Sequence, residues 1–185
     1  VFLWQGGLGL PDRDYYFLDD PSTKRIREAY PGHIAAMFRL MGEGEERARR
    51  AAEAVLEIET RLARASRTLE ELRDPYGNYN KMSLEELSRL APALDLPGQL
   101  ARMGIPPVDS VVVGQPEFYA SADSAFTSLP LEAWKDYLRW GLVNAFAARL
   151  GSSFDRQDFA FYGTLLNGTP RQRPRWKRVL DAEED

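Results

Sequence analysis

His33 is the one histidine of this 185-residue chain, so it is the first candidate for metal or nucleophile chemistry. Zinc sites use three or four Cys, His or carboxylate ligands, and with no cysteine in the sequence carboxylates would have to supply all the others. His33 also lies close to Ile34 and Met37, on the expected inner face of a helix. We therefore expect a hydrogen-bonded core or interface histidine. A Ser-His-Asp triad is disfavoured because no G-x-S-x-G motif accompanies it.

The stretch EAWKD places Glu132 and Asp136 one helical turn apart, so their carboxylates share a face and form an acidic pair. Trp134 and Leu138 occupy the apolar face of the same helix. The spacing therefore predicts that the acidic pair points to solvent.

A basic cluster in RQRPRWKR could bind phosphate or nucleic acid; it consists of Arg171, Arg173, Arg175, Lys177 and Arg178. The chain as a whole carries 24 Lys and Arg against 28 Asp and Glu, a net charge of −4, so no global field attracts nucleic acid. We expect salt bridges to acidic helices and no nucleic-acid partner. No residue receives a catalytic or metal-binding role, and the substrate-binding residues are unknown.

Composition favours one globular domain over residues 1–185, because 44% of the residues are hydrophobic and can supply a core. No apolar run approaches the ~18 residues of a membrane span. The absence of cysteine excludes disulfides and leaves the compartment open.

The clearest helix is expected from Glu45 to about Ser66. Its apolar face has a helical period and consists of Ala48, Ala51, Val55, Ile58, Leu62 and Ala65. Before it, a glycine-rich loop from Gln5 to Asp14 is followed by three aromatic residues that we expect to anchor the loop to the core. The helix after that loop contains Pro31-Gly32, which predicts a kink or a break.

The remaining pattern predicts an all-α domain of six to eight helices. One short extended segment, Val111–Val113, has no evident partner strand. A long helix opens after Pro130, with Gly151 as its stop and an apolar face of Leu131, Trp134, Leu138, Leu142, Ala145 and Phe146. A last helix begins at Pro174 with Trp176, Val179 and Leu180, but no closing signal follows, which suggests a piece of a longer protein.

Five segments, in order, resemble the neprilysin and endothelin-converting-enzyme family of zinc metallopeptidases. They are GGLGLPDRDYYF (Gly6–Phe17), YNKMSLEEL (Tyr79–Leu87), VVVGQPEFY (Val111–Tyr119), LEAWKDYLRW (Leu131–Trp140) and FYGTLLNGTPRQRPRWKRVLDAEED (Phe161–Asp185). The glycine-rich signature and the Arg-Trp-Lys-Arg run are the most specific of these motifs. Together the segments cover nearly the whole chain.

The resemblance implies that the chain is part of a helical N-terminal region, which in that family forms a lid over a water-filled chamber where oligopeptides are cleaved. Family members hold zinc on a His-Glu-x-x-His helix, with a third ligand from a later Glu-x-x-x-Asp motif. No family catalytic residue maps onto this chain, because His33 stands alone and Glu132 and Asp136 fall in the N-terminal region. The chain alone is therefore expected to be inactive and without zinc. The resemblance implies that its partners are the missing C-terminal catalytic region and, in the parent enzyme, an oligopeptide.

The lack of cysteine and the Ala- and Arg-rich composition favour a bacterial member, either exported or cytoplasmic. Two other readings stay open. The chain could be a free-standing helical module that binds a protein or peptide in a groove, or a nucleic-acid binder acting through Arg171–Arg178, which the negative net charge disfavours.

Overall fold

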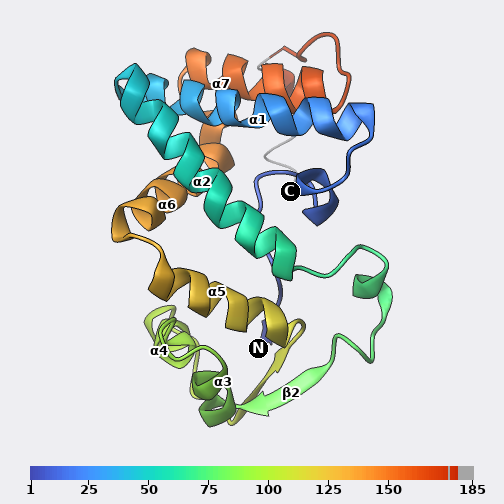
Figure 1. Cartoon of the computed structure of the whole chain (residues 1–185), viewed down its shortest axis with the longest axis vertical. Helices are drawn as coiled ribbons and strands as arrows, with labels where there is room; N and C mark the ends of the chain where they lie inside the picture. The colour runs from blue at the N-terminus through green and yellow to red at the C-terminus, as the bar shows by residue number, and fades with distance from the viewer. Residues whose placement is uncertain (175, 179–185) are drawn as a thin grey trace.

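The computed structural model describes residues 1–174 and 176–178 and contains, within them, seven α-helices and a small three-stranded sheet (Figure 1). The predicted all-α class is confirmed. Arg175 of the basic cluster, and Val179 and Leu180 of the predicted last helix, lie outside the described residues.

Helix α2 (Glu45–Ala65) is the central element, in contact with α1 (Pro21–Leu40), α5 (Pro116–Ser128) and α6 (Leu131–Phe146). Figure 1 shows it running diagonally through the molecule, with α1 and α7 at one end and α5 at the other. Its predicted apolar face is buried except for Ala65, which is half-buried. The periodicity therefore predicted both the helix and the side that packs.

Helix α1 continues without interruption through Pro31, so the predicted break is wrong. Pro31 has no N–H to donate to the Arg27 carbonyl, which ordinarily costs about 3 kcal/mol in a helix interior. Tyr30 and Ile34 on either side of it are fully buried against the core. We attribute the intact helix to this tertiary packing.

The extended segment has partner strands, contrary to the sequence-based expectation. Strand β3 (Ser110–Val113) lies between β1 (Phe2–Leu3), which runs parallel to it, and β2 (Asn80–Ser83), which runs antiparallel. Two residues of β1 are too few to show alternation, and β2 ends directly in the Ser83 capping box of α3 (Leu84–Leu90). Val111 and Val113 pack on Leu87 of α3, beside α4 (Leu96–Arg102).

The C-terminal helices differ from the prediction in where they end. Helix α6 stops at Phe146, a short 3₁₀ turn follows (Ala147–Arg149), and Gly151 is the N-cap of α7 (Ser152–Asp158) and not the stop of α6. The chain then continues as a π-helix, η4 (Phe159–Leu166), a rare geometry that often marks a site under constraint. None of the described helices has the length and apolarity to cross a bilayer.

The predicted buried face of α6 is largely exposed. Helix α6 instead buries Asp136 and Trp140, because these two side chains bond to α2. We name as the α6 strip four exposed apolar residues of the predicted face: Leu131, Leu138, Leu142 and Phe146.

Replacing Pro31 by alanine should stabilise the protein. The Pro31→Ala substitution restores one intrahelical hydrogen bond, so the free energy of unfolding should rise by about 1 to 3 kcal/mol in urea titrations. Pro21→Ala is the matched control, since Pro21 occupies the first turn of the same helix, where no bond is missing. A loss of stability in Pro31→Ala would contradict this account of α1.

Candidate functional site

A buried carboxylate, Glu59 of α2, lies at the centre of the core. The Tyr16 hydroxyl donates to its Oε2 at 2.7 Å, and the Tyr30 hydroxyl and the Trp140 indole N–H each donate to its Oε1 at 3.1 Å. The backbone N–H of Gly9 donates as well. These donors belong to the glycine-rich segment, the 3₁₀ turn η1 (Arg13–Tyr16), α1 and α6. Glu59 thus connects four segments to α2, and we call this group the Glu59 centre.

Burial governs the protonation of the Glu59 centre. It raises the pKa of Glu59 from 4.5 to about 7, although all four donors favour the ionised form. Burial and the neighbouring Glu59 raise the pKa values of Tyr16 and Tyr30 well above the usual value, so both remain neutral donors.

The glycine-rich segment fits against this centre only because it lacks side chains at two positions. A Cβ on Gly9 would lie 1.8 Å from the Tyr30 hydroxyl oxygen. Gly7 has a φ of 81°, and a Cβ there would lie 2.2 Å from the Tyr137 hydroxyl oxygen. Tyr137 donates to the Gly7 carbonyl at 2.7 Å, and Tyr162 of η4 donates to the Gly9 carbonyl at 2.8 Å. The expected aromatic anchoring of this loop is confirmed, with Tyr16 as its buried member.

His33 is a core histidine, as predicted. Its ring stacks on Phe161 at 4.6 Å between centroids and meets Trp140 and Tyr162 edge-on. Its Nδ1 lies 3.1 Å from the Gln157 amide nitrogen, and Nε2 is buried without a protein partner. Burial lowers the pKa of His33 from 6.5 to about 4, so the ring is neutral near pH 7.

Within the residues that the structure describes, no group of three or more His, Asp or Glu side chains is placed to hold a metal. The His33 ring is enclosed by aromatic rings, and its one polar partner is an amide.

The acidic pair is separated, so the prediction that both members face solvent is wrong for Asp136. Asp136 is buried, and its carboxylate accepts hydrogen bonds from both terminal guanidinium nitrogens of Arg47, at 2.5 and 2.8 Å. This hydrogen bond to Asp136 raises the pKa of Arg47. Glu132 is exposed and pairs with Lys135 at 2.6 Å. Asp136 therefore connects α6 to α2, whereas Glu132 lies on the surface.

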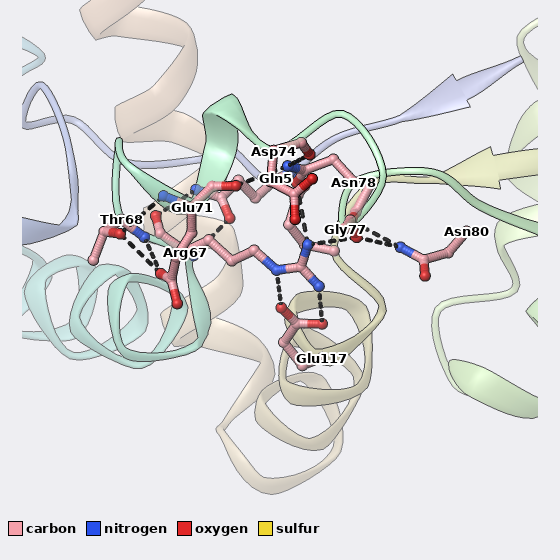
Figure 2. Close-up of polar contacts among 11 residues, drawn as sticks. Gln5, Arg67, Thr68, Glu71, Asp74, Gly77, Asn78, Asn80 and Glu117 are labelled. Atoms are coloured by element: carbon pink, nitrogen blue, oxygen red, sulfur yellow. Dashed lines mark hydrogen bonds and ion pairs between the residues drawn. The ribbon is translucent and has the colours of Figure 1, made fainter.

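A second polar network joins the sheet to the helices. Figure 2 shows the Arg67 guanidinium between Glu117 of α5 and the turn at Gly77 and Asn78, with a distance of 2.8 Å to the Gly77 carbonyl. The Gln5 side-chain amide makes two hydrogen bonds with the Arg67 backbone. It accepts the Arg67 N–H at 2.8 Å and donates to the Arg67 carbonyl at 3.1 Å. Buried Gln115 accepts the Gln5 backbone N–H and donates to Asn78. This network holds the glycine-rich segment at its other end.

Arg178 of the basic cluster forms the expected kind of salt bridge, to an acidic residue on a neighbouring helix. Its guanidinium bonds to both carboxylate oxygens of Asp155 on α7, each at 2.8 Å. Gln172 donates to the same carboxylate at 2.8 Å. This contact ties the segment after η4 back onto α7.

Sequence reasoning missed the Glu59 centre and the buried amides Asn78 and Gln115. Glu59 left a signal: it lies four residues after Val55 and four before Ala63, within the apolar face of α2. A charged residue at such a position predicts a buried carboxylate that needs donors. Asn78 left none, because turns are commonly rich in Asn. Gln115 left none either, since it stands alone directly before α5.

Known proteins share the sequence family and the fold of this chain. A family model described as "Peptidase family M13", for the N-terminal domain, matches residues 1–185. Endothelin-converting enzyme 1 of Cavia porcellus is 29% identical over 98% of the chain, and endothelin-converting enzyme-like 1 of Mus musculus is 28% identical over 81%. The chain spans only 24% and 20% of the length of these two relatives.

Solved structures of Mycobacterium tuberculosis zinc metalloprotease Zmp1 have the same fold. The open state and an inhibitor complex each align with a TM-score of 0.89 and 33% identity over 96% of the chain, and the chain covers 28% and 27% of them. The family model and the matching fold thus define a helical N-terminal domain of the zinc-metallopeptidase class. The chain belongs to peptidase family M13, the neprilysin family, as its sequence motifs indicated.

Substituting Glu59 by glutamine should change how stability depends on pH. Folded Glu59 keeps a proton between pH 4.5 and about 7 that the unfolded chain has lost, so this group lowers stability as pH rises through that range. Glu59→Gln removes this loss. Its stability relative to the native protein should therefore increase from pH 4.5 to 7, by roughly 3 kcal/mol.

His33 has the opposite effect in the native protein, because its lowered pKa reduces stability as pH falls from 6.5 to about 4. The comparison therefore uses the difference between variant and native protein, from urea midpoints at each pH. Glu57→Gln, an exposed site on the same helix, controls for the loss of one carboxylate. Parallel profiles for Glu59→Gln and native protein would refute the assignment.

The two members of the acidic pair should respond differently to loss of charge. Asp136→Asn leaves Arg47 without its buried anion and should lower the free energy of unfolding by about 2 kcal/mol. Glu132→Gln should leave the urea midpoint almost unchanged, because exposed pairs contribute little. Equal effects of the two substitutions would show that the Arg47–Asp136 pair does not stabilise the α2–α6 contact.

Proposed function

We propose that this chain is the non-catalytic helical lid portion of a neprilysin-like zinc metalloendopeptidase that cleaves oligopeptides. The observation that carries the proposal is the match to the peptidase family M13 N-terminal model over residues 1–185. The remainder of the protein would hold zinc and the catalytic residues, and it would be the partner of this domain. The oligopeptide substrate would bind in a chamber that the two parts enclose.

Rigidity of the domain supports a lid role. A lid must keep its internal structure while it moves against the rest of an enzyme. The Glu59 centre and the Arg67 network provide that stiffness here, because their buried bonds connect segments far apart in sequence. A lid of this kind excludes water and limits access by size.

A free-standing helical binding module is the second candidate, and the exposed α6 strip is the observation that favours it. Such a module would fold, bind and function without the rest of a peptidase. The proposed lid has no activity unless that remainder is present.

Peptide hydrolysis by complementation tests the lid proposal. Residues 1–185 with added zinc should not cleave a fluorogenic oligopeptide, because the described side chains include no group of three potential metal ligands. The full-length protein should cleave it, with activity lost on chelation. The same protein lacking residues 1–185 should lose its preference for short peptides over folded substrates, and adding the separate domain should restore that preference.

Two outcomes would overturn the proposal. The first is turnover by residues 1–185 alone that a chelator abolishes. The second is unchanged size discrimination after removal of the domain. An exposed charge variant away from α6, Glu57→Gln, serves as the control for handling and should complement as well as the native domain.

A further inference from the structure

The α6 strip is an apolar surface on a helix that is already well packed on another side. Leu131, Leu138 and Leu142 are 66%, 66% and 63% exposed, and Phe146 is 47% exposed. Their spacings of seven, four and four residues place them on one face of the helix. A soluble protein rarely leaves such a row of large apolar side chains uncovered.

The rest of α6 is already in contact with the domain. Asp136 and Trp140 are buried, and Ala133, Tyr137 and Val143 pack against the core clusters. Helix α6 is therefore apolar on two sides. A helix with this pattern is typical of one that lies between two layers of structure.

Charged side chains lie on the strip as well as next to it. Lys135, four residues after Leu131 and three before Leu138, is on the same face and pairs with Glu132. Arg139 pairs with Glu43 in the α1–α2 connection, at 2.8 Å. The strip is therefore a mainly apolar surface that includes charged side chains, a mixture that is usual in interfaces.

The length and shape of the α6 strip indicate what kind of element fits it. From Leu131 to Phe146 it extends about 22 Å along a helix axis, at 1.5 Å per residue. A helix face is convex, whereas peptide and small-molecule ligands occupy concave sites. Side chains at helical spacing form ridges that fit the grooves of a second helix. The partner that fits best is an amphipathic helix of about four turns.

We infer that an amphipathic helix from the same protein, outside residues 1–185, packs on the α6 strip. The chain spans only 24% of endothelin-converting enzyme 1 and 28% of the open mycobacterial structure, so relatives have ample further chain to supply it. The periodicity of the sequence also predicts that the α6 strip is buried. A helix packed on the strip would bury it. The inference rests on the proposed function for the identity of the longer protein, and it adds the surface and the kind of element that bind the domain to it.

Thiol labelling tests this inference, because residues 1–185 contain no cysteine. Leu138→Cys and Leu142→Cys are introduced singly, both in residues 1–185 and in the full-length protein, and modification is read on the peptide that carries the new cysteine. Both sites should react rapidly in residues 1–185. In the full-length protein they should react roughly tenfold or more slowly, since labelling then requires the interface to open. Tyr76→Cys, at a side chain 89% exposed and far from α6 in sequence, is the control, and its rate should change by less than about threefold.

Cross-linking identifies the occupant. A photoreactive residue at position 142 of the full-length protein should link to positions outside residues 1–185 that are spaced three or four residues apart. Links to a second copy, or protection that appears only when an oligopeptide is added, would overturn the inference. Equal labelling rates in the two proteins would overturn it as well.

The labelling readout does not depend on activity. A protected strip in a protein that cleaves no peptide would uphold the inference and refute the proposed function. An exposed strip in an active peptidase would refute the inference and uphold the proposed function.

Discussion

The fold depends on keeping one carboxylate, that of Glu59, in a dry core. Burying a carboxyl group costs free energy unless hydrogen bonds replace its water, and Tyr16, Tyr30, Trp140 and the Gly9 backbone provide those bonds. Each donor comes from a different element, so this requirement fixes the positions of α1, α6, η1 and the glycine-rich segment relative to α2. The Arg67 network acts in the same way at the sheet, where buried amides replace water around backbone groups.

The parts of the fold that sequence predicts are those governed by local periodicity. Helix α2 shows its buried face in every turn, and the Ser83–Glu86 capping box begins α3 where the motif requires. The Pro31 break was wrong because burial of Tyr30 and Ile34 outweighs one missing hydrogen bond. Strand β1 could not be predicted, since its partner β3 lies more than a hundred residues away and two residues carry no pattern.

The candidate site shows the same limit. His33 was predicted as a core histidine because its neighbours are apolar, whereas the cage of Trp140, Phe161 and Tyr162 comes from distant helices. Asp136 was assigned to solvent because α6 has two apolar sides and the sequence alone does not say which one this domain buries. Family resemblance came from short motifs, and the structure shows that the glycine-rich motif packs closely against Tyr30 and Tyr137.

That last point bears on how such sequences are sorted. Gly7 and Gly9 are required by steric fit, because a Cβ at either position would collide with a tyrosine hydroxyl. A relative that had lost its metal ligands would still need both glycines to keep this packing. The signature GGLGLPDRDYYF therefore reports on an architecture.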